Sequence, residues 1–278
     1  MFEKLKKVSV RPTNPGLLEC RVEARVATDK GPHRQTNEDS GQVVVSDKGV
    51  LVIVADGMGG HQGGEVASAM AVRMVCEGYA ACDADPGAAL IGAVEEANRE
   101  IYGVAHRHSA LAGMGTTCTA VAVVDGMAYS AHVGDSRAYL VRGSQIYRMT
   151  EDHSATMAMV KQGVLTMKEA REHEDRNVIL RAVGTHEEVE VARWERPLAL
   201  HPGDRMLVCS DGLHDVVEDE EMCAIAGSNE PEHACAQLVK LALDRDCKDN
   251  VTVAVLRVYG ASEKNCAGPK VTRVAEMQ

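Results

Sequence analysis

Residues 41–57 have the sequence GQVVVSDKGVLVIVADG, and this stretch decides the fold class. Two runs rich in β-branched residues, Gly41–Ser46 and Val50–Ala55, flank Asp47-Lys48-Gly49, whose residues favour a tight hairpin turn. The second run contains no polar residue before Asp56. We therefore predict a hairpin of two strands, the second of which ends at an acidic residue.

Two long helical patterns follow the hairpin. Apolar residues recur at helical spacing on one face of residues 64–79, and again from Leu90 to Val104 in a segment that opens with Asp85-Pro86. Aspartate is a favourable N-cap, and proline is well accommodated at the first helical position. Two helices with one apolar stripe each are expected to pack side by side on a sheet.

Three strands are predicted next, over residues 116–124, 127–133 and 137–142. Asp125-Gly126 is a strong signal for a two-residue hairpin between the first two. Because these strands follow one another through tight turns, we expect them to pair in antiparallel order. Residues 150–190 contain few apolar runs and many charges, so we expect short surface helices there and no part of the core.

Two further strands, over residues 205–209 and 251–258, enclose a helical pattern over residues 232–243. The first 19 residues are polar and contain two prolines, so we predict a flexible N-terminal arm over residues 1–19. Residues 261–278 show no periodicity and are predicted to be a disordered tail.

The composition excludes several classes of protein. The formal charge of −11 disfavours nucleic acid as a partner, because nucleic-acid binding needs a basic face. No apolar run of about 20 residues and no signal-peptide core are present, so we expect a soluble cytoplasmic monomer without a membrane partner. The nine cysteines are odd in number and lack C-x-x-C spacing, which indicates buried thiols in a reducing compartment.

Four aspartates occupy the ends of the predicted strands. Asp56 and Asp211 end apolar strands and precede glycine, Asp135 lies in a turn between two strands, and Asp249 stands directly before the last strand. An acid at the mouth of an apolar strand is costly unless something satisfies it. One such acid alone is best explained as a turn former. Four together indicate carboxylates on one rim, which is how proteins hold hard divalent cations.

The segment GPHRQTNED, residues 31–39, adds an arginine to these acids. Arg34 stands four and five residues before Glu38 and Asp39. Arginine binds phosphate as a fork and carboxylates can serve metals, although the segment alone is equally explained as a charged loop with an internal ion pair. Combined with the rim of aspartates, Arg34 suggests two-metal phosphoester hydrolysis, in which a bridging water of lowered pKa attacks a phosphate held by arginine.

These segments together resemble the PPM family of metal-dependent serine/threonine protein phosphatases (type 2C), and its bacterial branch in particular. The matching segments, in the family's order, are Arg34–Asp39, Val54–Gly60, Gly115–Thr117, Gly134–Arg137, Thr150–Ser154, Ser210–Gly212 and Asp249-Asn250. Each is a weak signal alone, but the ordered set is specific and spans nearly the whole globular part.

The resemblance implies an α+β fold, a four-layer α/β/β/α sandwich of two antiparallel sheets flanked by antiparallel helix pairs. Residues 20–260 would then form the phosphatase catalytic domain, with a mobile flap at about residues 155–190. The hairpins and paired amphipathic helices predicted above are compatible with that architecture without singling it out.

By position in the motifs, the resemblance also implies a centre of two Mn²⁺ or Mg²⁺ ions. Asp56 would bridge both ions, and Gly57 would ligate through its carbonyl oxygen. Asp211 and Asp249 would complete the shell of one ion. The expected reaction is hydrolysis of phosphoserine and phosphothreonine on proteins, with a bacterial serine/threonine kinase and its substrates as partners.

The remaining implied roles belong to four residues near this centre. Glu38 or Asp39 would act through waters on the second ion. Asp135 would serve a third, weaker ion, sharing Asp211, and Arg34 would bind the substrate phosphate.

One position departs from the animal branch of the family, where a histidine two residues after the bridging aspartate is proposed as general acid. Here that residue is Met58, which cannot donate a proton. The hypothesis is that a metal-bound water or His61 protonates the leaving group. An unchanged kcat and pH profile for His61→Ala on a phosphopeptide would remove His61 from this role.

Three other functions are alternatives to a metal-dependent protein phosphatase. A cysteine phosphatase needs Cys-x5-Arg, and none of the nine cysteines has an arginine six residues later. A non-catalytic phosphoprotein-binding module is disfavoured because all the metal-type acids and Arg34 are retained. A phosphatase of the same fold acting on a small phosphorylated metabolite remains a further alternative.

Overall fold

The hairpin of residues 41–57 forms the first two strands at one side of a six-stranded sheet in the computed structural model, which describes residues 21–59 and 63–260. The predicted arm, the predicted tail and His61 lie outside the described residues. The sheet has the order β2-β3-β5-β6-β9, with β4 paired to the end of β3. Its strands are β2 (Asp39–Ser46), β3 (Gly49–Met58), β4 (Gly115–Thr116), β5 (Cys118–Val124), β6 (Met127–Val133) and β9 (Leu198–Ala199).

A second sheet of five strands lies against the first, in the order β1-β11-β10-β7-β8. All its neighbours pair antiparallel. Its strands are β1 (Arg21–Asp29), β7 (Arg137–Arg142), β8 (Gln145–Arg148), β10 (Arg205–Cys209) and β11 (Val251–Tyr259).

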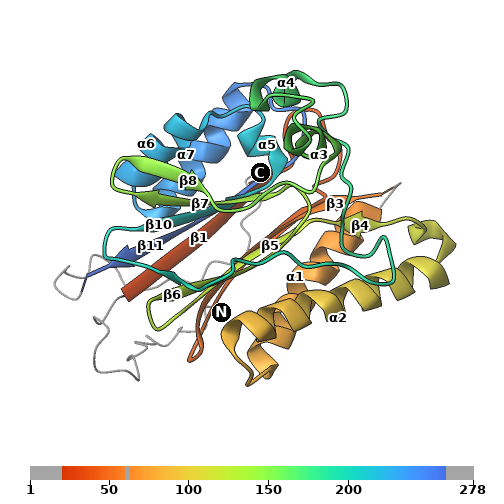
Figure 1. Ribbon diagram of the computed structural model, residues 1–278, viewed down its shortest axis with the longest axis horizontal. Helices are drawn as coiled ribbons and strands as arrows, with labels where there is room; N and C mark the ends of the chain where they lie inside the picture. Colours follow the sequence, from red (N-terminus) through yellow and green to blue (C-terminus); the bar gives the residue numbers. More distant parts are fainter. Residues whose placement is uncertain (1–20, 60–62, 261–278) are drawn as a thin grey trace, which may run out of the picture.

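Helices cover the outer face of each sheet, so the molecule has four layers (Figure 1). The six-stranded sheet carries α1 (Gly63–Ala81) and α2 (Pro86–Arg107), and the five-stranded sheet carries α6 (Asp219–Ser228) and α7 (Pro231–Asp244). The Asp85 carboxylate caps α2 by accepting from the backbone N–H groups of Gly87 and Ala88. This confirms the four-layer α+β sandwich and the predicted cap.

The second strand of the hairpin is apolar from Val50 to Ala55 because each of its two faces packs into a different hydrophobic core. Along β3, Leu51, Ile53 and Ala55 face the core under α1 and α2, whereas Val52 and Val54 face the core between the two sheets. A third core lies between the five-stranded sheet and α6 and α7. Because β3 is buried on both faces, its sequence does not alternate between apolar and polar residues.

The expected antiparallel pairing of three consecutive strands after residue 115 is wrong for the last of them. β5 and β6 pair as predicted around Asp125-Gly126, but β7 belongs to the other sheet and pairs with β8 and β10. The turn between β6 and β7 carries the chain across the sandwich, and Gly134 in that turn has φ +107°, which side chains rarely tolerate. Asp135 therefore lies in the turn where the chain passes from the six-stranded to the five-stranded sheet.

Residues 150–190 contain two short helices, α3 (Ala155–Lys161) and α4 (Met167–Glu172), with exposed apolar side chains such as Leu180. The prediction of surface helices is confirmed, but Ala182 and Val183 are buried. Val183 belongs to the core under α1 and α2 and exchanges two backbone hydrogen bonds with Thr116, so this part of the segment corrects the expectation that none of it joins the core.

The remaining elements are short: the 3₁₀ turn η1 (Ser109–Leu111) and α5 (Asp211–His214). Helix α5 and helix α6 were not anticipated from the sequence. The seven cysteines within the described ranges are all free, and six of them are buried, as expected for thiols. In the same ranges, no helix has the length and apolar character needed to span a bilayer.

Candidate metal centre

The acids predicted at strand ends meet at one end of the sandwich. Asp39, the first residue of β2, pairs directly with Asp56 near the end of β3. Asp211 follows β10, and Asp249 stands two residues before β11, which pairs with β10. The two sheets thus contribute two acids each to a common edge.

A hydrogen bond joins the two sheets at this edge. The Ser210 hydroxyl donates to Asp39 Oδ2 at 2.7 Å, and Ser210 Oγ in turn accepts from the Thr252 backbone N–H at 3.0 Å. The Asp56 backbone N–H donates to Thr117 Oγ1 at 2.8 Å. The backbone on both sides of the rim is therefore held by buried hydroxyl groups.

The Glu38 and Gly57 backbones are also fixed. Asn250 Oδ1 accepts from the Glu38 N–H at 2.8 Å, and the Gly57 N–H donates to the Glu38 carbonyl at 3.0 Å. A Cβ atom on Gly57 would lie 2.0 Å from the Gly64 carbonyl oxygen, so the first turn of α1 packs directly on this strand end. Glycine is required here because no side chain fits between β3 and α1.

These carboxylates destabilise one another when they are charged. Burial raises the pKa of Asp56 well above its ordinary value, and the charges of Asp39, Asp211, Asp135 and Asp249 raise it further. Burial and nearby acids likewise raise the pKa of Asp211. A positive charge placed among them would reverse this effect.

The same cause acts on three flanking acids. Burial is the largest cause raising the pKa of Asp39 to about 6 and the pKa of Asp135 to about 7. Burial also raises the pKa of Glu38, with Arg34 acting in the opposite direction. The pKa values of these five acids are thus all raised, which is the direction that a bound cation would reverse, and the charge of Asp249 contributes to the shifts of Asp39, Asp56 and Asp211.

Unpaired buried oxygens provide a second test of whether the centre fits a metal. Asp39 Oδ1, Asp135 Oδ1 and Asp211 Oδ1 are buried without a hydrogen-bond partner. Buried carboxylate oxygens normally find a donor, so these three have the character of ligands or of partners for ordered water. The donor set is all oxygen, which suits Mg²⁺ or Mn²⁺.

Within residues 21–59 and 63–260, no group of three or more Asp, Glu, His or Cys side chains could hold a metal ion by itself. Hard cations such as Mg²⁺ keep several waters and take only one or two carboxylates each. The residues therefore fit a hydrated centre and do not fit a closed cage.

Arg34 lies at the rim and pairs with one of the acids. Its Nη2 is 2.5 Å from Asp249 Oδ2, and its Nε is 3.4 Å from the Lys248 carbonyl. Nearly half of the Arg34 side chain is exposed, so the guanidinium can be approached from solvent. The structure therefore places Arg34 and Asp249 in direct contact at this edge.

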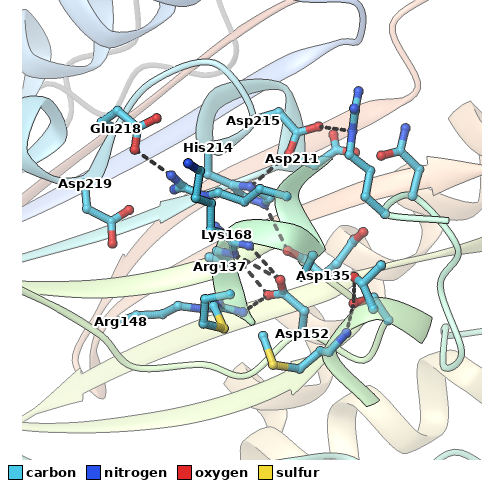
Figure 2. Close-up of a pocket in the computed structure, with 18 of the residues that line it drawn as sticks. Asp135, Arg137, Arg148, Asp152, Lys168, Asp211, His214, Asp215, Glu218 and Asp219 are labelled. Carbon is cyan, nitrogen blue, oxygen red and sulfur yellow. Dashed lines mark hydrogen bonds and ion pairs between the residues drawn. The ribbon is translucent and has the colours of Figure 1, made fainter. Parts of the chain in front are cut away.

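Asp135 and Asp211 also line a cavity of about 540 Å³ that extends beneath α3 and α4 (Figure 2). Arg137 in its wall binds the Asp152 carboxylate through Nε and Nη2, at 3.1 and 2.7 Å. Burial alone would raise the pKa of Asp152, but these hydrogen bonds and the Arg137 and Arg148 charges lower it to about 2. This pair stays ionised and fixes one wall of the cavity.

The sequence analysis missed the groups that hold the acids in place. Thr117, Ser210 and Asn250 were quoted within motifs but were given no role, although each hydrogen-bonds the backbone or side chain of a rim acid. His214, buried in α5, was not singled out at all. Polar residues next to strand-end acids were the available signal for the first three.

Comparison with known proteins identifies the relatives of this architecture. The family model described as Protein phosphatase 2C matches residues 32–241. The Serine/threonine phosphatase stp of Listeria innocua is 36% identical over 242 residues, which cover 84% of this chain and 95% of that protein. The match therefore extends over almost the entire relative.

Solved structures agree with the sequence relatives. The Mycobacterium tuberculosis serine/threonine phosphatase PstP/Ppp superimposes with a TM-score of 0.77 at 36% identity, covering 86% of this chain and 99% of that one. The PstP catalytic domain in complex with two manganese ions gives a TM-score of 0.75 at 34% identity, with 86% and 99% covered. Each superposition covers 99% of the solved chain.

Proposed function

The chain belongs to the protein phosphatase 2C family and is a metal-dependent serine/threonine protein phosphatase, and on this basis we propose which of its residues form the active centre. Asp56 would bridge two ions, Gly57 would ligate through its carbonyl, and Asp211 and Asp249 would complete the shell of one ion. The observation that carries this proposal is the edge where both sheets present mutually repelling, buried carboxylates with unpaired oxygens.

The bound ions would supply a water of lowered pKa and positive charge opposite the phosphate oxygens. The chain's own residues orient this chemistry. Thr117 and Ser210 fix the strand ends that carry Asp56 and Asp39. Glu38 or Asp39 would act through waters on the second ion, consistent with the fixed Glu38 backbone and the buried Asp39 carboxylate.

Arg34 would hold the substrate phosphate. Its guanidinium now pairs with Asp249, which is also a proposed metal ligand. A cation held by Asp249 would compensate its charge, and the Arg34 fork would then be available for two phosphate oxygens. We therefore expect phosphate to bind the metal-loaded protein more tightly than the metal-free protein.

Met58 cannot protonate the leaving group, and the one titratable side chain of β3, Asp56, is the proposed bridge between the ions. We keep the hypothesis that a water or His61 donates this proton. His61 lies outside the described residues. Relatives named as serine/threonine phosphatases do not favour a non-catalytic binding module or a small-metabolite phosphatase.

Phosphorylated proteins are the substrates of this family, and we propose that a bacterial serine/threonine kinase and its targets are the partners of this chain. A cytoplasmic monomer is consistent with its free cysteines. Either Mn²⁺ or Mg²⁺ would suit the all-oxygen centre, and Asp135 with Asp211 would serve a third, weaker ion. The region of α3 and α4, residues 155–190, would be a mobile flap bordering the cleft.

The direct experiment measures manganese-dependent hydrolysis of a phosphothreonine peptide by the full chain, with EDTA as control. We expect activity that EDTA abolishes and that added Mn²⁺ restores. Asp249→Asn is expected to lower activity strongly and to reduce the number of tightly bound Mn²⁺ ions. Full activity in EDTA would contradict the proposed centre.

A further inference from the structure

The turn that carries Asp135 is pressed tightly against a neighbouring strand. Gly134 has φ +107°, and a Cβ atom at this position would lie 2.5 Å from the side chain of Thr117, the residue directly before β5. The turn also crosses from the six-stranded sheet to the five-stranded sheet, so neither sheet's ladder supports it. Its position must be maintained by other contacts.

Two histidines from different segments supply those contacts, His153, which is half-buried, and His214, which is buried. The His153 backbone N–H donates to the Gly134 carbonyl at 2.7 Å, and His153 Nδ1 accepts from the Gly134 N–H at 3.1 Å. On the following residue, His214 Nε2 lies 3.1 Å from the Asp135 carbonyl oxygen. Because a carbonyl only accepts, His214 Nε2 carries the proton and donates.

His214 connects this turn to the helix that begins with Asp211. It is the last residue of α5, three residues after Asp211, and is only 6% exposed. Figure 2 shows its ring between Asp215 and Asp135, and Nδ1 is 3.4 Å from Asp215 Oδ1. A single side chain thus links the backbone of Asp135 to the helical turn that carries Asp211.

The carboxylates of Asp135 and Asp211 each have one oxygen without a hydrogen-bond partner. Asp135 Oδ1 and Asp211 Oδ1 are both buried without a hydrogen-bond partner and line the same cavity. The hydrogen bond from His214 does not reach either carboxylate, so it leaves their oxygens free while restricting the separation of the segments. This is the arrangement expected of a group that orients ligands for an ion.

We propose that His214 is a positioning residue that holds Asp135 in register with Asp211, so that the two carboxylates can share a divalent cation. The inference rests on the proposed third ion at Asp135 and adds the residue that organises its site. Groups that orient metal ligands typically change metal affinity by about 10- to 100-fold when removed. The effect of His214 should therefore appear in metal binding and not only in turnover.

The experiment is calorimetric titration of Mn²⁺ into the metal-free full chain, comparing His214→Leu with His214→Gln. Leucine fills similar space without a donor, whereas the Gln Nε2 can reach the position of the histidine Nε2. Asp135→Asn identifies the weak binding event, and we expect it to abolish that event. Glu218→Gln, which removes the partner of Arg171 in the same cavity, is the matched control and should leave the isotherm unchanged.

We expect His214→Leu to weaken the Asp135-dependent event by about 10- to 100-fold, and His214→Gln to restore it to within a few fold. The tighter events serve as an internal check that each variant is folded. If Asp135→Asn removes the weak event but His214→Leu leaves it unchanged, the role of His214 is overturned while the third ion stands. If Asp135→Asn changes nothing, both the third ion and this inference fail.

Discussion

The buried ring of His132 should make the stability of the fold depend on pH. It is only 2% exposed on β6, its Nε2 is 3.0 Å from the Glu151 carbonyl, and its Nδ1 is 2.9 Å from Thr119 Oγ1. The carbonyl requires a proton on Nε2, so Nδ1 of the neutral ring is an acceptor, and it shares the single Thr119 hydroxyl proton with the Ser136 carbonyl, which lies 3.0 Å from the same Oγ1. Burial lowers the pKa of His132 from 6.5 to about 4.

This pKa shift determines the sign and the size of the change in folding stability with pH. An unfolded chain binds a proton at His132 near pH 6.5, whereas the folded chain does so only near pH 4. The contribution to stability is therefore complete above pH 6.5 and is lost as the pH falls toward 4. At roughly 1.4 kcal/mol per pKa unit, the loss is about 3 kcal/mol over this window.

The assay is urea denaturation of the metal-free wild type and of His132→Gln at a series of pH values through this window. Burial also lowers the pKa of His153 to about 4, so the comparison between the two proteins isolates His132. We expect the stability advantage of the wild type to shrink by about 3 kcal/mol as the pH falls. Parallel curves for the two proteins would refute the assignment of a neutral, buried His132.

Three further predictions follow from the proposed metal centre. Thr117→Val leaves the buried Asp56 N–H without its acceptor, so we expect a loss of about 1–3 kcal/mol in stability and lower kcat/KM, both restored in Thr117→Ser. Arg34→Lys replaces a fork by a point charge, so the inhibition constant of inorganic phosphate should rise about tenfold or more. Mn²⁺ at about 100 times its Kd should stabilise the metal-free protein by about 2.7 kcal/mol in thermal unfolding, and an unchanged Tm would count against the centre.

The sequence was sufficient to predict most of the strands and the helices on one sheet, because their patterns are local. The apolar run before Asp56 and the cap at Asp85 depend on residues close in the chain. The path of β7 was not predictable in this way. A turn of Gly134 and Asp135 has the composition of a hairpin turn, which would keep β7 beside β6. Only the packing of the core between the two sheets decides that β7 joins the other sheet and pairs with β10.

The site shows the same division. Acids at strand ends could be found from the sequence because each follows or precedes an apolar run. Their supports could not, because Ser210 and Asp39 are separated by 171 residues and meet only when the sheets pack. His214 carries no sequence signal either, since a single histidine after Asp211 is ordinary in a short helix.

The most direct test of the two-metal centre is Asp56→Asn, measured for Mn²⁺ binding, for phosphopeptide hydrolysis and for thermal stability without metal. Asparagine keeps the size of Asp56 but removes a charge that its buried acidic neighbours destabilise. We predict loss of tight Mn²⁺ binding and of turnover, together with a metal-free fold at least as stable as the wild type. Appreciable manganese-dependent turnover in Asp56→Asn would contradict the account.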